Sequence, residues 1–355
     1  MNDCDYMRLA LTLAERGVGW VSPNPLVGAV LVKDGRIIGQ GWHARCGGLH
    51  AERSALADCR EDPAGAALYV TLEPCCHTGR QPPCTDAILA AGIRRVVVGS
   101  MDPNPLVAGK GVEILRSHGV EVETGVLRAA CDALNPVFFH YIRTKRPYVV
   151  MKYAMTLDGK IATRTGASQW ITGEAARQRV HQDRHRYRGI LAGVGTVLAD
   201  DPLLTCRMEN GRNPVRVICD TRLRTPLDSR IVRTANEVET ILATCETDGE
   251  RIAPYTAAGC QVWQLPAREG HVDLSALMDR LGAAEIDGVL LEGGGTLNWS
   301  MLEAGLVQRV QAYIAPKLFG GVGAKSPVEG TGVELPAQAA RLRNPTVTRL
   351  GADFL

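Results

Sequence analysis

The spacing of apolar residues predicts alternating helices and strands through the first part of the chain. Apolar residues recur at helical intervals over residues 6–16, and a continuous apolar run over 27–32 is typical of a buried strand. Asp34-Gly35 predicts a hairpin turn into a return strand. The further elements expected are helices at 51–59, 86–91, 112–118 and 129–143, and strands at 36–41, 66–72, 93–99 and 120–124. Strands that alternate with helices indicate a layered α/β domain.

The pattern breaks at residues 144–147, where T-K-R-P interrupts the last of these helices, and we place a domain boundary there. The second half is predicted to hold strands at 148–154, 190–194, 215–220 and 288–292, a turn and return at 157–162, and a helix at 174–188. A chain of 355 residues also favours two domains over one. We therefore expect two α/β domains, at 1–145 and 147–355.

Composition excludes several classes of function. Hydrophobic residues make up 45% and charged residues 22%, as in globular proteins. The net charge is +2 with acidic and basic residues interleaved, which gives no electrostatic footprint for nucleic acid. No apolar run reaches transmembrane length, and the acidic opening is unlike a signal peptide. We expect no nucleic-acid or membrane partner, and a cytoplasmic protein whose 11 cysteines are reduced thiols.

An H-x-E motif followed by two cysteine motifs indicates a zinc site. The residues are His50, Glu52, Cys75 and Cys84. Zinc accepts imidazole nitrogen and thiolate sulfur, and a catalytic zinc keeps one position open for water. His50, Cys75 and Cys84 are the expected ligands, and Glu52 the proton shuttle that zinc deaminases place beside the metal. Because residues two apart on a helix point about 200° apart, His50 must stand where its helix begins for Glu52 to face the same metal.

Other interpretations of these residues stay open. Cys76 is a rival ligand, and the eight residues between Cys75 and Cys84 depart from the usual C-x-x-C spacing. Taken singly, each cysteine could be a small buried hydrophobe, and His50 an ordinary core or surface residue. The combination in this order favours the metal site.

Four weaker signals lie elsewhere. The turn at residues 293–295 is glycine-rich and could offer its N–H groups to a phosphate, or be no more than a tight strand-to-helix turn. Asn24 could contact the edge of a base, or simply form its turn. Asp158 is by default part of a hairpin turn, and Asp200 could cap the turn before a proline.

Together these motifs make the chain resemble the family of bifunctional riboflavin-biosynthesis deaminase–reductases over almost its whole length. The matching stretches are S-P-N-P at 22–25, H-A-E at 50–52, E-P-C-C-H-T-G-R-Q-P-P-C at 73–84, D-P-N-P at 102–105, and residues 152–159, 193–202 and 292–295. The family commonly has a small hydroxyl residue where this chain has Cys76. The resemblance implies a cytidine-deaminase-like three-layer zinc domain, followed by a domain similar to dihydrofolate reductase.

The resemblance also implies two consecutive steps on one phosphoribosyl pyrimidine, with zinc and NADPH as cofactors. The first half would deaminate 2,5-diamino-6-hydroxy-4-(5-phosphoribosylamino)pyrimidine hydrolytically, with Glu52 carrying the proton. The second half would use a hydride from NADPH to reduce the ribosyl chain of 5-amino-6-(5-phosphoribosylamino)uracil to ribityl. A homo-oligomer is implied too, since similar reductases often pair through their sheets.

Residue roles follow from the same resemblance. In the first half the substrate contacts would be Asn24 and His77, with His43, Arg80 and the 102–104 loop as further candidates. NADPH would touch Ala154, Trp170, Thr196, Asp200, Thr221 and the turn formed by Gly294, Gly295, Thr296, Leu297, Asn298, Trp299 and Ser300. The second substrate would touch Lys152, Ser168, Arg184, Leu204, Arg207 and Glu292.

Chemistry agrees with part of this assignment and leaves part of it open. Arg184 and Arg207 suit a ribose phosphate, which a guanidinium can hold bidentately. Either Lys152 or Asp200 could assist the opening sugar oxygen. Arg222 could meet the extra phosphate of NADPH, or be a solvated residue after a strand.

Two other functions compete with this one. The first is a deaminase of a free base or of tRNA whose second half only binds, although the missing basic stripe argues against tRNA. The second is a structural zinc module that tethers a partner. Structural zinc sites usually have four protein ligands, and Glu52 would then have no task.

Overall fold

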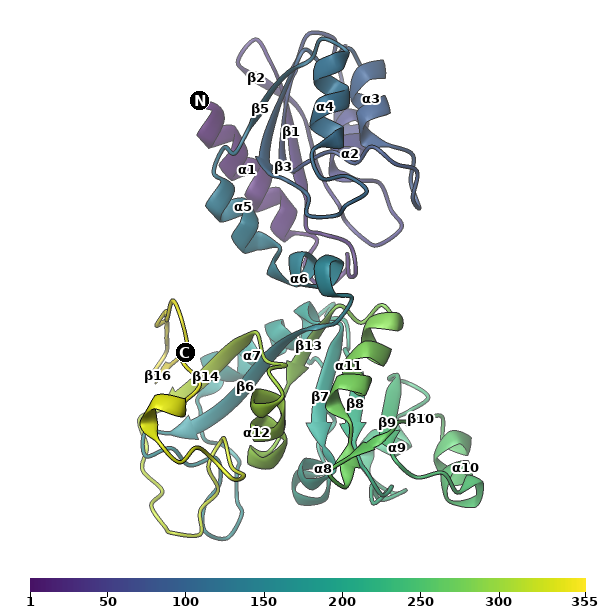
Figure 1. Cartoon of the computed structure of the whole chain (residues 1–355). Helices are drawn as coiled ribbons and strands as arrows, with labels where there is room; N and C mark the ends of the chain where they lie inside the picture. The colour runs from purple at the N-terminus through teal and green to yellow at the C-terminus, as the bar shows by residue number, and fades with distance from the viewer. The chain divides into compact units, whose positions relative to one another are not determined.

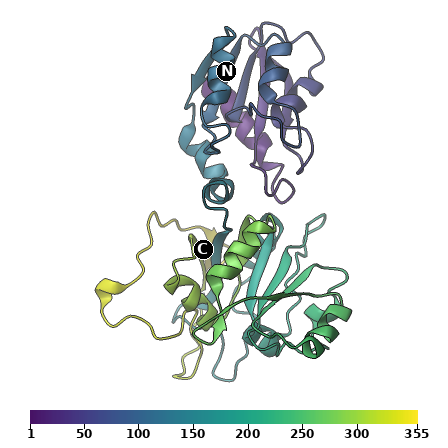
Figure 2. The ribbon, with the colours of Figure 1, turned by 45° about the vertical axis from the view of Figure 1, so that its right-hand side comes forward.

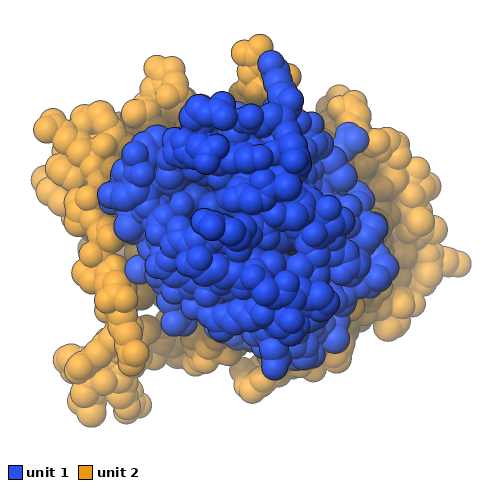
Figure 3. Space-filling model, turned by 90° about the horizontal axis from the view of Figure 1, so that it is seen from above, with its two compact units in different colours: residues 1–145 blue, residues 146–355 orange.

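The computed structural model describes all 355 residues, which divide into two compact units, residues 1–145 and 146–355 (Figure 3). Each unit is an α/β structure built on its own sheet (Figure 1). This confirms the predicted fold class. No helix in the structure combines the length and the apolar character that a membrane crossing requires.

The first unit is a five-stranded sheet covered on both faces. Its strands are β1 (Gly28–Lys33), β2 (Arg36–Trp42), β3 (Ala67–Leu72), β4 (Arg95–Ser100) and β5 (Glu121–Thr124). Its helices are α1 (Asp3–Glu15), α2 (Ala51–Asp58), α3 (Cys84–Ala90), α4 (Lys110–Ser117), α5 (Arg128–Leu134) and α6 (Pro136–Thr144). The strand order is β2-β1-β3-β4-β5, antiparallel between β2, β1 and β3 and parallel from β3 to β5.

The side chains of each strand alternate between the two faces of the sheet, and helices cover both faces, so this unit has three layers. In β1, Val30 and Val32 pack under α1, whereas Ala29 and Leu31 belong to the core on the side of α2. Helices α1 and α5 cover one face of the sheet, and α2, α3 and α4 cover the other (Figure 1). The candidate metal ligands lie on the side that α2, α3 and α4 cover. His50 directly precedes α2, Cys75 follows β3, and Cys84 begins α3.

The second unit is a nine-stranded, mostly parallel sheet with order β10-β9-β8-β7-β13-β6-β14-β16-β15. Its strands are β6 (Tyr148–Thr156), β7 (Gly189–Gly193), β8 (Val215–Cys219), β9 (Thr240–Thr244), β10 (Gln261–Gln264), β13 (Gly288–Leu291), β14 (Arg309–Ala315), β15 (Arg349–Leu350) and β16 (Asp353–Phe354), with a separate hairpin of β11 (Ala267–Arg268) and β12 (His271–Val272). Its helices are α7 (Glu174–Arg186), α8 (Val194–Asp200), α9 (Arg230–Arg233), α10 (Gly249–Ala257), α11 (Leu274–Ala283), α12 (Gly295–Glu303) and the 3₁₀ turn Pro336–Gln338.

The strands from β10 to β14 run parallel, so their carboxyl ends meet at one edge of the sheet (Figure 2). Helices cover both faces, which explains why β7, β9 and β13 consist largely of buried apolar residues. In open sheets of this kind ligands bind beyond the carboxyl ends.

The chain ends by returning to this sheet. Strand β16 pairs antiparallel with β14, next to the edge formed by β15. The carboxylate of Asp353 is buried and accepts the backbone N–H of Gly173, at 2.6 Å, where α7 begins.

Two predictions of local structure are wrong. The helix expected over 129–143 is divided into α5 and α6, because Pro136 has no N–H to continue it and Asn135 bonds elsewhere. The Asn135 amide accepts the N–H of Leu26 and donates to its carbonyl, both at 2.8 Å. The return strand expected within 157–162 is absent, because Asp158 and Ile161 bond instead to the loop at 319–325.

Candidate active sites

The first unit brings one imidazole and two thiols together. Nδ1 of His50 lies 3.4 Å from Sγ of Cys75 and 3.4 Å from Sγ of Cys84. The three ligand atoms all lie within 4.8 Å of one another. Zinc bonds of ~2.3 Å to sulfur and ~2.0 Å to nitrogen at tetrahedral angles place N and S about 3.5 Å apart. The donor set and its spacing therefore fit a zinc ion with three protein ligands.

The local backbone explains why Glu52 faces the same place. His50 is the N-cap of α2 and has an extended conformation (φ −70°, ψ 159°), so it precedes the regular helix as the sequence requires. Glu52 lies in the first turn of α2 and is buried, with 3% of its surface exposed. Cys84 is the first residue of α3, and its N–H donates to Cys75 Sγ at 3.4 Å.

Burial and mutual contact shift the ionisation of these groups. Burial, with a contribution from the nearby Cys75, raises the pKa of Glu52 to about 7. Hydrogen bonding from the Cys84 thiol, and then from His50, lowers the pKa of Cys75 to about 4. The pKa of Cys84 is raised, because its thiol donates to Cys75 and is buried. The same contacts thus favour the thiolate form of Cys75 and the thiol form of Cys84.

The candidate base contacts partly surround this cluster. Asn24 Nδ2 lies 3.0 Å from Nε2 of His43, whose ring meets that of His50 edge-on with centroids 5.4 Å apart. His77 is half-buried, and its Nδ1 is buried with no hydrogen-bond partner. Arg80 is exposed and donates to Cys46 Sγ at 2.8 Å.

Cys76 lies apart from the other two candidate cysteines. Its thiol is directed to the carbonyl of Leu106, 3.7 Å away, and it is not one of the three clustered donors. Adjacent cysteines rarely reach one tetrahedral ion together, and here the chain directs the two sulfurs to different partners.

Glu73 has a role that the sequence alone did not indicate. Its buried carboxylate accepts four backbone N–H groups, from Asp102, Gly109, Gly111 and Val112, at 3.0 to 3.3 Å. It therefore fixes the 102–112 loop and the start of α4 against the strand that leads to Cys75. Burial raises the pKa of Asp102, in this loop, to about 6. An acidic residue before the cysteine motif was the available signal.

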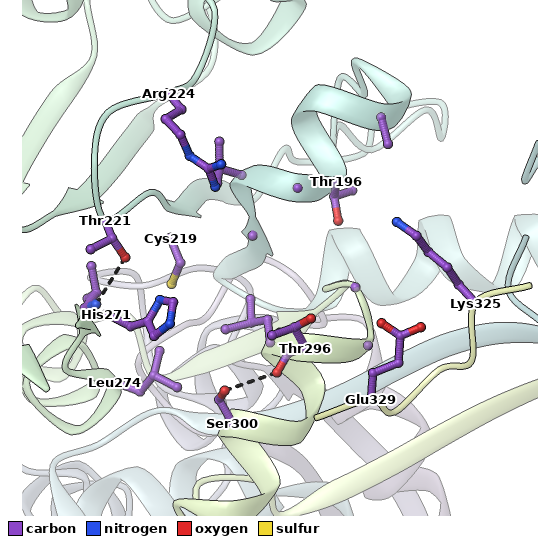
Figure 4. Close-up of a pocket in the computed structure, with 18 of the residues that line it drawn as sticks. Thr196, Cys219, Thr221, Arg224, His271, Leu274, Thr296, Ser300, Lys325 and Glu329 are labelled. Atoms are coloured by element: carbon purple, nitrogen blue, oxygen red, sulfur yellow. Dashed lines mark hydrogen bonds between the residues drawn. The ribbon is translucent and has the colours of Figure 1, made fainter. Parts of the chain in front are cut away.

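The second unit holds a cavity of about 960 Å³ at the carboxyl ends of β7, β8 and β13 (Figure 4). Ten of the residues singled out from the sequence line it: Ser168, Thr196, Asp200, Thr221, Arg222, Gly294, Gly295, Thr296, Leu297 and Ser300. Ser168 donates to Asp200 at 3.2 Å, so these two are held together. The cavity thus joins segments that are far apart in the sequence.

The glycine turn enters this cavity at the start of a helix. Gly294 is the N-cap of α12 and has no side chain to satisfy the first N–H groups of the helix. A Cβ on Gly295 would lie 2.6 Å from Glu329 and 2.8 Å from the carbonyl of Ser326, so only glycine fits. Bare N–H groups at a helix N-terminus are suited to a phosphate.

A second group of charges lies on β6, α7 and β13. Glu292 receives a bidentate bond from Arg184, at 2.8 and 3.0 Å, and lies 3.5 Å from Lys152 Nζ. Burial alone would raise the pKa of Glu292, but Arg184 and Lys152 lower it to about 2. Lys152 and Arg184 are thus held in a fixed arrangement around one carboxylate.

Arg207 and Leu204, two further predicted substrate contacts, have different surroundings. Backbone N and Nε of Arg207 lie 3.3 and 3.2 Å from the two ring nitrogens of His181, of which a neutral imidazole can accept at only one. Burial, with Arg184 and Arg207, lowers the pKa of His181 to about 4. The Leu204 side chain is buried in the core, so only its backbone is available to a ligand.

Four predicted cofactor contacts do not line the cavity. Ala154 is half-buried in β6, and Trp170 is exposed with the Arg177 guanidinium 4.9 Å above its ring. Asn298 is buried and donates to the carbonyl of Pro327 at 2.8 Å, and Trp299 packs against Gly330. Asn298 and Trp299 thus hold their own helix, α12, against the loop at 327–330.

Comparison with known proteins connects both sites to one family. Residues 1–100 match the cytidine and deoxycytidylate deaminase zinc-binding region, and residues 147–355 match the RibD C-terminal domain. The chain is 55% identical to the riboflavin biosynthesis protein RibD of Actinobacillus pleuropneumoniae, over 100% of this chain and 94% of that protein. The RibD protein of Aquifex aeolicus is 43% identical over 99% and 97% of the two chains.

The chain belongs to the RibD family. Its structure is similar to that of Acinetobacter baumannii RibD, with 38% identity and a TM-score of 0.89 over 99% of this chain and 97% of that one. A Thermotoga maritima protein described as a diaminohydroxyphosphoribosylaminopyrimidine deaminase/5-amino-6-(5-phosphoribosylamino)uracil reductase is 39% identical, with a TM-score of 0.88 and the same coverage.

RibD family membership makes the chain a bifunctional enzyme of riboflavin biosynthesis, with a zinc-binding deaminase domain and a reductase domain that implies a nicotinamide cofactor. The predicted fold class and bifunctional activity are confirmed. The alternative of a non-enzymatic zinc module is wrong, and so is that of a second half that only binds.

Proposed function

We propose that residues 1–145 deaminate 2,5-diamino-6-hydroxy-4-(5-phosphoribosylamino)pyrimidine and that residues 147–355 then reduce the ribosyl chain of 5-amino-6-(5-phosphoribosylamino)uracil with NADPH. The observation that carries the proposal is the N/S/S donor set of His50, Cys75 and Cys84 beside a buried carboxylate. The Thermotoga maritima relative, whose name states both activities, supports the choice of substrates.

In the deaminase step His50, Cys75 and Cys84 would hold one zinc ion. Zinc when bound makes hydroxide available near neutral pH. Glu52, buried beside the donors, would take one proton of the water and pass it to the ring nitrogen, and would then pass the second proton of the water to the departing ammonia. Asn24, positioned by His43, and the unpartnered Nδ1 of His77 would orient the pyrimidine.

In the reductase step the cavity of the second unit would take NADPH, with its pyrophosphate at the turn that begins α12. The nicotinamide supplies a hydride to the anomeric carbon. The Arg184–Glu292–Lys152 group would contact the substrate, with Lys152 as the residue that protonates the opening ring oxygen. Asp200, bonded to Ser168, would position the sugar instead. Arg207 would contact the phosphate beside Arg184.

We also infer a homo-oligomer in the cytoplasm. Leu318, Leu335, Leu342 and Val347, in the segment that leads to β15, are 59 to 79% exposed, and association with a second copy would cover apolar side chains of this kind. The eleven cysteines are all free thiols, which suits a reducing compartment. Light scattering of the purified protein would measure the assembly directly.

The deciding experiment is incubation of the protein with the diaminopyrimidine phosphoriboside, with and without NADPH. Ammonia should be released in both reactions, and NADPH should be oxidised only after ammonia appears. Oxidation of NADPH without ammonia release would contradict the order of steps. Ammonia release with no oxidation would contradict the assignment of the second unit.

A further inference from the structure

Helix α7 carries a buried acid that the proposed mechanism does not use. Of the thirteen residues of this helix, only Ala176 and Asp183 are buried, and Asp183 is 2% exposed. A buried carboxylate between a helix and a sheet costs free energy unless other groups bond to it. The partners of Asp183 therefore determine how this part of α7 is held on the sheet.

Three side chains interact with the Asp183 carboxylate. The hydroxyl of Tyr313 donates to Oδ2 at 3.2 Å, and Nε of Arg179, one turn earlier on α7, lies 3.7 Å from Oδ1. The buried side chain of Gln311 also bonds to this carboxylate. Tyr313 is wholly buried, and burial, followed by the nearby Asp183, raises the pKa of its hydroxyl, which therefore keeps the proton that it donates. The carboxylate thus fixes the hydroxyl end of the Tyr313 ring.

The strand positions explain why the ring of Tyr313 reaches Lys152. In the parallel pair of β6 and β14, Lys152 lies opposite Gln311, and Ala154 lies opposite Tyr313. Residues two apart on a strand point to the same face, so Tyr313 is the diagonal neighbour of Lys152 on one face of the sheet. Nζ of Lys152 lies 5.7 Å from the centroid of the Tyr313 ring. A cation at this distance is attracted by the negative face of an aromatic ring.

Lys152 therefore has a different neighbour on each side of β6. On the side of β13, the Glu292 carboxylate lies 3.5 Å from the ammonium and also accepts two hydrogen bonds from Arg184. On the side of β14, the ring of Tyr313 attracts the ammonium without accepting a directed hydrogen bond. An ammonium has three N–H donors, so this arrangement holds the group in place and leaves donors free for a substrate.

We propose that Tyr313 is a positioning residue of the reductase: its ring face holds the Lys152 ammonium in place for proton transfer, and Asp183 holds the ring. This inference rests on the proposed function, because it takes Lys152 as the residue that protonates the opening ring oxygen. Tyr313 acts through Lys152 and not on the reacting atoms, because it is wholly buried. The position of a proton donor matters, since a displacement of about 1 Å can cost about 10²-fold in rate.

The electron density of the Tyr313 ring distinguishes this role from simple packing. Packing depends on the shape of the ring, which fluorine atoms in place of hydrogen atoms change little. Attraction of a cation depends on the negative charge at the ring face, which each fluorine withdraws. A series of phenylalanines with an increasing number of fluorines at position 313 therefore separates the two roles.

The first test takes full-length Tyr313→Phe as its reference and adds fluorines to that ring, measuring NADPH oxidation in a single turnover with deaminated substrate. The rate should fall with each fluorine, by about 2- to 30-fold in total, the range for a cation–π contact, while the affinity for NADPH stays unchanged. The same series at Tyr255, a buried tyrosine of this unit whose hydroxyl bonds to backbone carbonyls, is the matched control and should be flat. A flat or rising series at position 313 would overturn the inference.

The second test is independent of turnover. In protein carrying ¹³C at the lysine ε-carbon, the ring current of Tyr313 should shift the ε-proton signal of Lys152 upfield, and Lys152→Arg identifies that signal by its loss. Tyr313→Leu should return the signal to the position of an exposed lysine. An unshifted signal in the wild type would overturn the inference. A shifted signal in a protein whose Lys152→Met variant reduces substrate at the wild-type rate would instead contradict the proposed role of Lys152, with the contact itself retained.

Discussion

In the first unit the donor atoms of His50, Cys75 and Cys84 lie within 4.8 Å of one another, whereas in the second the residues around the cavity come from three strand ends and enclose about 960 Å³. The first arrangement suits one ion and one planar ring. The second suits a long dinucleotide that needs separate contacts for each of its parts. The size of each ligand is therefore reflected in how far apart its contacts lie in the fold.

The two sites also differ in what fixes their charges. In the first unit the donors are an imidazole and two thiols, and a bound zinc ion requires both thiols to lose their protons. In the second unit Glu292 is already neutralised by Arg184 and Lys152. We expect the deaminase site to depend on its metal, and the reductase site to be preformed by its own side chains.

Removing the metal should separate the two activities completely. A chelator, or the Cys84→Ser substitution, should abolish ammonia release, because two remaining donors hold zinc far more weakly than three. Reduction of previously deaminated substrate should continue at the wild-type rate. Metal analysis together with both assays would check this, and loss of reductase activity in parallel would show that the sites are not independent.

Glu52→Gln should reduce the kcat of deamination by about 10²- to 10⁴-fold, the usual contribution of a positioned acid–base group. The amide keeps the shape of the side chain but cannot carry a proton, so zinc content should remain at one per chain. Glu113→Gln, at an exposed position on α4, is the control. A variant with unchanged ammonia release would exclude Glu52 as the proton carrier.

Glu292→Gln should destabilise the second unit and change its response to acid. The pKa of Glu292 is about 2 in the folded chain and about 4.5 ordinarily, so its carboxylate stabilises the fold above pH 4.5. That stabilisation, about 3 kcal/mol, is lost as the pH falls from about 4.5 to 2. Urea unfolding at several pH values should show this loss in the wild type and in Glu250→Gln, but not in Glu292→Gln. Parallel curves for all three proteins would contradict the assignment.

Cys76→Ser should have the smallest effect, within about twofold on ammonia release, with zinc content unchanged. The Cys76 thiol faces the carbonyl of Leu106 rather than the other donors, and a serine hydroxyl can make that contact as well. Cys75→Ser, at the neighbouring position, should lose zinc. If the two variants lost zinc equally, Cys76 would have to be counted among the ligands.

Local patterns predicted a large part of the first unit. The Asp34-Gly35 hairpin is present, with Lys33 opposite Arg36 and positive φ at both turn residues. A turn of this kind is specified by two adjacent residues, so the sequence is sufficient. The metal donors were predictable for a similar reason, since zinc requires particular residue types and only three of them.

Long-range contacts could not be predicted in this way. The break at Pro136 was visible, but the bond from Asn135 to Leu26 that fixes it joins distant segments. Strands β9, β10 and β14 were missed because short apolar runs in a parallel sheet have no distinctive period. The four hydrogen bonds that the Glu73 carboxylate accepts exist only after folding has brought the end of β3 and the 102–112 loop together.

The bond between Asp353 and Gly173 has a practical consequence for anyone who prepares this protein. It joins Asp353 to the start of α7, the helix that bears Arg184. Removing Asp353, by truncation or by substitution, would leave that N–H unsatisfied and loosen the helix. Any shortened form of the protein therefore has to retain Asp353.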